Sequence, residues 1–367
     1  MIRMAITRIN VGPIHPSTHG VARLVVDVDG DTIVNVEPHV GFLHRGVEKL
    51  TETRMYMQAP PYMEKLDYFA PMAYNDAYVA AVEAAMNIQP SEKAKYVRTI
   101  LLELQRLASH LVSIGTLCND LGQMFTGFMW AFKDRDIILD LLQEATGSRM
   151  FYVNMRLGGL HSELPADFEE HAITTMNYIE KRIGEYESYI EKNTVFMERM
   201  KGVGVLSSED AKALGVTGPV LRASGINYDV RKNSPYYAYS KLYFNPKVML
   251  QGDNFSRYKV RMMEMRESAR LVKAAIKAMP DGAATGMPVK LRSPNAVNKV
   301  SVVSREVPRG ECMMYLVADP QKPYRLSIRS PSMVNLAAIS HIAKGARFAD
   351  LFSIFGTLDV VLGCVDR

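Results

Sequence analysis

The stretch 90–117, PSEKAKYVRTILLELQRLASHLVSIGTL, most constrains the fold, because its apolar residues recur at helical spacing along most of its length. Ser91 stands where an N-cap residue would begin such a helix. A long helix with one apolar face must bury that face against other elements. The predicted apolar face holds Val97, Ile100, Leu101, Leu104, Leu107, Ala108 and Leu111.

Two further stretches, residues 167–200 and 255–279, carry the same period, so we predict a central helical bundle. The first would bury Ile173, Met176, Ile179, Ile183, Tyr186 and Ile190. The second would bury Tyr258, Met262, Met265, Ala269, Val272, Ile276 and Met279. Its opposite face carries Arg257, Lys259, Arg261, Arg266, Arg270, Lys273 and Lys277. We expect a solvated face there, and the alternative is contact with an acidic partner.

The two ends of the chain favour strands. ARLVVDVDGDTIVNVEP, residues 22–38, is typical of a β-hairpin with its turn at Asp29-Gly30. CMMYLV and YRLSIR predict short strands in the last third, before a final helical stretch. The fold class is therefore α+β. We divide it into an N-terminal antiparallel sheet region (1–50), a helical bundle (51–290) and a mixed C-terminal part (291–367), all within one compact body.

Composition excludes several classes of protein. Three cysteines, at positions 118, 312 and 364, form no CxxC pair, so we expect no metal or iron–sulfur centre held by this chain alone. The net charge of +5 is mild, and no zinc-finger spacing or aromatic RNA-binding signature indicates a nucleic-acid partner. The first residues lack the apolar run of a signal peptide, and no 18-residue apolar run predicts a membrane span. The reducing cytoplasm fits best.

Local patterns leave the candidate site open. VGPIHPSTHGV, residues 11–21, brings His15 and His19 into a loop near the chain start, where prolines and a glycine disfavour a helix. Such a loop is more often a hydrogen-bonded turn than a donor site at a cavity. Tyr68 alone is most simply a core tyrosine. Asp120 is the only charged residue from Leu111 to Phe132, and a buried carboxylate there needs a partner such as histidine.

Seven stretches together resemble one family nearly end to end: the 49-kilodalton (D) subunit of respiratory complex I and its relatives. They are GPIHPSTHGVARLVVDVDGD, PHVGFLHRGVEKL, YMQAPPYMEKLDYF, GVTGPVLRASGINYDVRK, PRGECMMYLV, KPYRLSIRSP and GTLDVVLGCVDR. The resemblance implies a fold like that of the large subunit of nickel–iron hydrogenases. It also implies a quinone headgroup cavity shared with a small iron–sulfur partner, the B subunit, which would hold the terminal [4Fe–4S] cluster.

The same resemblance assigns roles at matching positions. His19 matches the histidine that binds the headgroup, Tyr68 matches the tyrosine on its other side, and Asp120 matches the aspartate paired with that histidine. Arg45 matches an arginine beside the partner's cluster, and His15 would support the loop. Quinone reduction takes two electrons and two protons, so donors such as phenol and imidazole suit a dry pocket.

One departure from the related hydrogenases excludes their activity. Those enzymes hold nickel with two CxxC pairs, whereas this chain lacks the N-terminal pair. At the C-terminus it keeps only Cys364, with Val361 where the second cysteine would stand. One thiol does not hold such a centre.

The resemblance further implies partners: B, C and I-type hydrophilic subunits and a membrane H-type subunit, at the cytoplasmic side of the cell membrane. The function expected is the quinone-site subunit of a proton-pumping dehydrogenase. Two alternatives stay open. One is the equivalent subunit of an archaeal deazaflavin- or ferredoxin-linked enzyme that reduces methanophenazine, and the other is a scaffold without redox activity.

Overall fold

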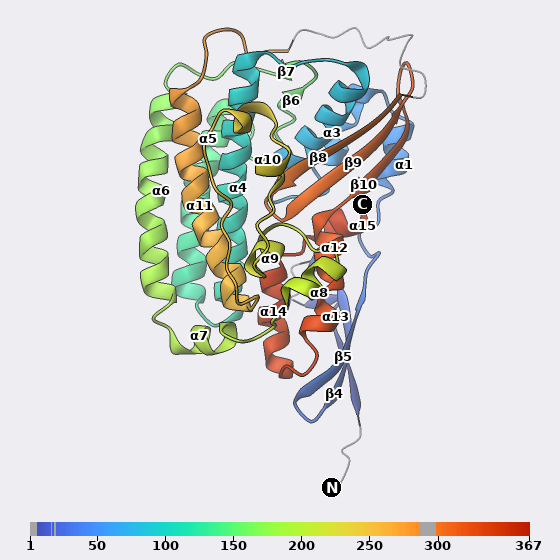
Figure 1. Ribbon diagram of the computed structural model, residues 1–367, viewed down its shortest axis with the longest axis vertical. Coiled ribbons are helices and arrows are strands. Elements are labelled where there is room, and N and C mark those ends of the chain that lie inside the picture. Colours follow the sequence, from blue (N-terminus) through green and yellow to red (C-terminus); the bar gives the residue numbers. More distant parts are fainter. Residues whose placement is uncertain (1–5, 16, 18–19, 287–298) are drawn as a thin grey trace.

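The computed structural model describes residues 6–15, 17, 20–286 and 299–367. A bundle of long helices fills one side, a three-stranded sheet covered by a helix lies beside it, and a second sheet projects from the body (Figure 1). The predicted α+β class, with a small N-terminal antiparallel sheet, helices in the middle and a C-terminal sheet, is confirmed.

The bundle consists of α4 (Glu92–Asp120), α5 (Met129–Thr146), α6 (Phe168–Ile190) and α11 (Asn254–Lys277). Helices α4 and α6 each contact both α5 and α11. The hydroxyl of Ser91 accepts the amide hydrogen of Ala94, which confirms the predicted N-cap. The predicted apolar faces of α4 and α11 are buried, except that Met279 lies beyond the end of α11 and is half-buried.

The prediction of one helix over 167–200 was wrong, since α6 ends at Ile190 and α7 (Thr194–Met200) follows. The Asn193 side chain accepts the amide hydrogen of Phe196 and begins the new helix. Ile173, predicted in the core, is exposed on α6.

The prediction of a solvated cationic face on α11 was wrong for most of its residues, although Arg270 and Lys277 are exposed. Arg257 and Arg261 are buried, and backbone carbonyls of Gly252 and Gly204 accept hydrogen bonds from Arg257. Farther along the helix, Lys259, Arg266 and Lys273 form ion pairs with glutamates of α6. The neighbouring helix supplies the acidic groups, so these side chains tie two helices of one chain together.

The N-terminal sheet has the antiparallel order β1 (Thr7–Val11), β4 (Arg23–Asp29), β5 (Thr32–His39). The predicted hairpin is confirmed, but its turn consists of Gly30 and Asp31, one residue later than predicted, between the paired residues Asp29 and Thr32. Gly30 has φ 64°, a conformation that glycine adopts without strain.

The C-terminal sheet has the order β10 (Pro323–Arg329), β9 (Gly310–Ala318), β8 (Lys299–Val307). Both predicted strands are present, and β8 was not predicted. Helix α3 (Pro71–Met86) packs on β8 and β9 (Figure 1). One hydrophobic core contains residues between Val47 and Cys364, and a second contains residues between Val11 and Val365. Each core includes residues of more than one predicted part, so the division at residues 50 and 290 stays a prediction.

Short elements connect these layers: β2 (Ile14–His15), β3 (Gly20–Val21), α1 (Val47–Glu52), η2 (Tyr56–Gln58), α2 (Pro60–Met63), η3 (Met124–Phe128), β6 (Met155–Arg156), β7 (Gly159–Leu160), α8 (Ser208–Ala213), α9 (Gly218–Ala223), α10 (Val230–Asn233), η4 (Tyr237–Ser240), α12 (Pro331–Ala337), α13 (Ile339–Ile342), η5 (Phe348–Asp350), α14 (Leu351–Leu358) and α15 (Leu362–Asp366). Within the described ranges, no helix combines the length and the apolar character needed to cross a bilayer.

Candidate functional site

His15 lies in a small hairpin near the start of the chain. Strand β2 pairs with β3 so that His15 lies opposite Gly20. The His15 ring stacks on Phe352 of α14, with ring centroids 5.1 Å apart, and its Nδ1 accepts the amide hydrogen of Ser17 at 3.2 Å. His15 is therefore held by contacts with α14 and with the amide of Ser17. His19 lies outside the described residues.

Tyr68 lies between α2 and α3 and is half-buried. A Cβ atom placed on Gly20 would lie 3.5 Å from the Tyr68 hydroxyl oxygen and 3.2 Å from Cδ1 of Leu362. Burial raises the pKa of Tyr68, and the neighbouring Asp67 carboxylate adds to that rise. The structure thus brings the residue next to His19 against a phenol that stays protonated at neutral pH.

Arg45 lies at the same edge and is exposed. Its Nη2 donates to the carbonyl of Lys65 at 2.8 Å and to that of Gly363 at 3.2 Å. Its positive charge lowers the pKa of Tyr68 and so opposes the rise that burial causes. The guanidinium thus links the segment before Tyr68 to the C-terminal helix α15, and its place beside a partner's cluster stays a prediction.

Asp120 is the last residue of α4 and is half-buried, so the expectation of a fully buried carboxylate was wrong. The physical reason is its place at a helix end, where the chain turns into η3 at the surface and Phe125 is 84% exposed. Because His19 lies outside the described residues, the pairing of Asp120 with it stays a prediction.

The local patterns missed a buried ionic row beneath Tyr68. Arg309 Nη1 lies 2.7 Å from Asp67 Oδ2, and Arg309 Nη2 lies 3.3 Å from Asp359 Oδ1. All three side chains are buried. The signal was available, since each residue falls within a stretch that carries the family resemblance, at EKLDYF, PRGE and GTLD.

Glu64 is a second buried carboxyl near the site that sequence reasoning missed. Its Oε1 accepts hydrogen bonds from Asn75 Nδ2 at 3.0 Å and from the amide of Val153. Its Oε2 has no hydrogen-bond partner among the described residues. Burial raises the pKa of Glu64 to about 7. Val153 has φ 41°, a strained value for a β-branched residue.

In the part of the chain that the structure describes, no group of three or more His, Cys, Asp or Glu side chains is placed to hold a metal ion. Cys364 is buried, and Ser330 Oγ donates to its Sγ at 3.0 Å. Burial raises the pKa of the Cys364 thiol, which disfavours the thiolate that binds metal.

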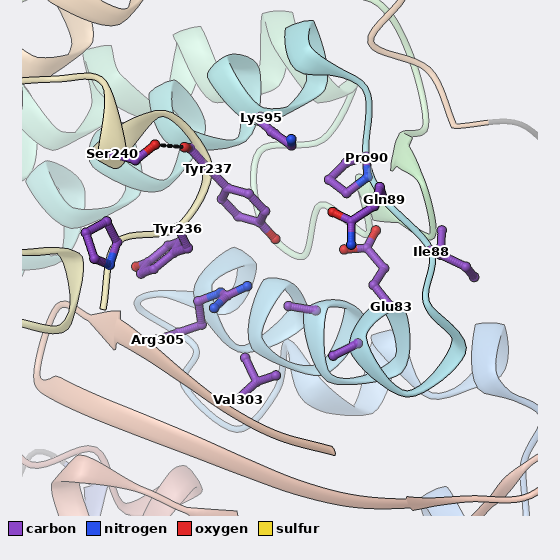
Figure 2. Close-up of a pocket in the computed structure, with 13 residues that line it drawn as sticks. Glu83, Ile88, Gln89, Pro90, Lys95, Tyr236, Tyr237, Ser240, Val303 and Arg305 are labelled. Atoms are coloured by element: carbon purple, nitrogen blue, oxygen red, sulfur yellow. Dashed lines mark hydrogen bonds between the residues drawn. The ribbon is translucent and has the colours of Figure 1, made fainter. Parts of the chain in front are cut away.

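A surface cavity of about 370 Å³ lies elsewhere, between α3, the start of α4, η4 and β8. Figure 2 shows Glu83, Tyr237 and Arg305 around it. The charged groups already have partners: Glu83 is 2.7 Å from Arg98, and Arg305 is 3.3 Å from Asp76. Of the predicted site residues that the structure describes, none lines this cavity.

Comparison with known proteins gives a consistent result. The family model described as "Respiratory-chain NADH dehydrogenase, 49 Kd subunit" matches residues 120–367. A protein of Dehalococcoides mccartyi, named as the D subunit of an NADH-quinone oxidoreductase, is 44% identical, with 98% of each chain covered. Proteins with the same name from Geobacter sulfurreducens and Desulforamulus reducens are each 41% identical. The matches cover 100% and 98% of this chain and 100% and 97% of their own, respectively.

Proposed function

Because the chain belongs to the family of the 49-kilodalton subunit of the respiratory-chain NADH dehydrogenase, we propose that it forms one wall of a quinone-reducing site. The observation that carries the proposal is the approach of strand β3 to Tyr68. Gly20, which directly follows His19, lies against the Tyr68 hydroxyl although the two are far apart in sequence. Two proton donors of suitable chemistry would therefore meet at one place.

The chemistry follows from the donors. A quinone that accepts two electrons gathers negative charge on its two oxygens and needs two protons to become a quinol. Tyr68, with its raised pKa, offers a neutral O–H to one oxygen, and His19 is the proposed donor to the other. Asp120 is the proposed partner that orients the His19 imidazole and stabilises its cationic form.

The electrons would come from a partner. We assign the terminal [4Fe–4S] cluster to the B subunit and place Arg45 beside it, where a cation favours the reduced cluster. C and I-type subunits and a membrane H-type subunit complete the proposed assembly, at the cytoplasmic side of the cell membrane. The relatives' names contain NADH and quinone, which favours these reactants over deazaflavin or ferredoxin and methanophenazine.

Variants in the assembled complex test the proposal. We expect Tyr68→Phe to lower the kcat of quinone reduction about 10²-fold, because the phenol is the proton donor. His19→Ala is expected to act in the same direction. Tyr324→Phe, at an exposed tyrosine of β10, is the matched control. Native gels would establish that each complex assembles. Unchanged turnover in both site variants would contradict the proposal and favour a scaffold without redox activity.

A further inference from the structure

The turn that carries Tyr68 is held from beneath by the side chain of the residue before it. Asp67 Oδ1 accepts the amide hydrogens of Phe69 at 3.1 Å and of Ala70 at 3.2 Å. Asp67 has no exposed surface. One carboxylate oxygen therefore fixes the backbone that directly follows Tyr68, at the point where α3 begins.

The other oxygen of Asp67 is held by Arg309. Arg309 Nη1 donates to Asp67 Oδ2 at 2.7 Å and to Ser109 Oγ at 3.0 Å. Its Nη2 reaches Asp359 at 3.3 Å. A buried carboxylate is costly without an opposite charge, and a planar guanidinium can serve two carboxylates at once. Arg309 is therefore the cation that two buried acids share.

Close backbone contacts fix the position of Arg309 itself. It lies in the turn between β8 and β9, where a Cβ on Gly310 would lie 2.4 Å from Thr217 Oγ1. A Cβ on Gly218 would lie 2.5 Å from the Arg309 carbonyl oxygen. Asn335 Nδ2 donates to that same oxygen at 3.2 Å. The turn is packed without room for a side chain at either glycine. The backbone that carries the Arg309 side chain is therefore held in one position.

The charges of Asp67 and Arg309 affect the pKa of Tyr68. Burial raises the pKa of Tyr68, the Asp67 carboxylate raises it further, and the Arg309 guanidinium opposes this rise. Burial also raises the pKa of Asp67 itself, and Arg309 opposes that rise too.

Other titratable groups face Asp67 from the elements around it. Asp359 adds a negative charge from the end of α14. The buried side chains of Tyr74 in α3, Cys312 in β9 and Cys364 in α15 have pKa values raised by burial, so they stay neutral at pH 7. Arg309 therefore supplies the positive charge that pairs with Asp67, and the buried Arg261, whose Nε lies 3.7 Å from Asp359 Oδ2, adds a second cation to the row.

We propose that Arg309 is a positioning residue of the quinone site, which holds Asp67 and thereby fixes the turn that presents the Tyr68 hydroxyl. This inference rests on the proposed function. Arg309 acts through Asp67 and does not itself touch the quinone. Without it, Asp67 would be buried without a counter-charge, would bind a proton at a higher pH, and would hold the two amides less firmly.

The test compares Arg309→Gln and Arg309→Lys in the assembled complex, with kcat and KM for quinone measured from pH 5.5 to 9. We expect Arg309→Gln to lower kcat about tenfold or more, with a smaller change in KM. Its acid limb is expected to move by about one pH unit toward alkaline pH, because a nearby opposite charge shifts a carboxyl pKa by about one to three units. Arg309→Lys should restore much of the wild-type acid limb.

Two further variants keep the test decisive. If Arg309→Gln fails to assemble, the double variant Asp67→Asn/Arg309→Gln carries the test, because a neutral amide at position 67 can still accept both backbone hydrogens. We expect it to assemble and to show no acid limb from residue 67. Arg325→Gln is the matched control. It removes an exposed arginine of β10 that pairs with Glu52 of α1, and it should keep the wild-type profile.

The outcomes separate the inference from the proposed function. Normal turnover in both Tyr68→Phe and His19→Ala would overturn both. Impaired turnover in Tyr68→Phe, together with a wild-type pH profile in Arg309→Gln, would overturn the role of Arg309 alone. An alkaline shift of equal size in Arg325→Gln would also overturn it, because the effect would then come from general surface charge.

Discussion

At the residue scale, Glu64 shows how a buried group can destabilise the fold. It is fully buried, and one of its two oxygens has no hydrogen-bond partner among the described residues. Burial raises its pKa from 4.5 to about 7. Its other oxygen holds the amide of Val153, in a segment where Phe151 and Val153 both have positive φ. The Glu64 carboxyl group therefore anchors strained backbone near the Tyr68 turn.

This pKa predicts a pH dependence of stability. The native chain keeps the Glu64 proton up to about pH 7, whereas the unfolded chain releases it near 4.5. The contribution of Glu64 is therefore fully present below pH 4.5 and is lost as the pH rises through 7. The loss amounts to about 3 kcal/mol at most. Urea unfolding of the full chain should show Glu64→Gln to be more stable than wild type at pH 8 and about equal at pH 4.5.

The control for that measurement is Glu209→Gln, at an exposed position in α8. It should leave the free energy of unfolding unchanged at both pH values. A Glu64→Gln chain that is less stable than wild type at pH 8 would contradict the prediction, because Glu64 would then be ionised in the native chain without penalty.

Some site residues could be predicted from the sequence and others could not. The family motifs selected Tyr68 and Arg45, and the structure brings both to one edge of the fold, with Gly20 against Tyr68. Arg309 and Asp359 were overlooked as functional residues, because a charged residue in a turn is usually solvated. The burial of Arg309 depends on contact with Asp67, which is 242 positions away in the sequence.

At the element scale, apolar periodicity correctly predicted α4 and α11, although α4 is buried on every side from Tyr96 to Gly115 and not on one face alone. It failed between α6 and α7, since the apolar pattern continues past the break and the competing signal is a single cap. The interpretation of the charge pattern failed on α11, where cationic residues that look solvated meet acidic residues of α6. Both failures come from contacts that a single segment does not contain.

The break between α6 and α7 leads to a prediction about the stability of the fold. Asn193→Ala should lower the free energy of unfolding by about 1 kcal/mol, because the amide of Phe196 would lose its side-chain acceptor. Denaturant unfolding of the full chain measures the difference. Ser188→Ala, which removes an exposed hydroxyl from α6, should cost less. Equal costs for the two variants would mean that Asn193 contributes nothing as a cap.

At the scale of the whole molecule, the candidate site joins segments from both ends of the chain. The β2–β3 hairpin comes from the start, Tyr68 from the entry to α3, Arg309 from the C-terminal sheet and Leu362 from the last helix. Helix α14 supports the hairpin through the stacking of His15 on Phe352. No local pattern predicts such an assembly, and the family resemblance anticipated it only as a set of positions.

The central claim is that the quinone headgroup binds between the β2–β3 hairpin and Tyr68. Photolabelling of the assembled complex with an azido-quinone, followed by peptide mapping, tests it most directly. We predict label on peptides that cover residues 12–23 and 65–70, and loss of that label when excess natural quinone competes. Label confined to other parts of the chain or to other subunits, with the same competition by quinone, would contradict it.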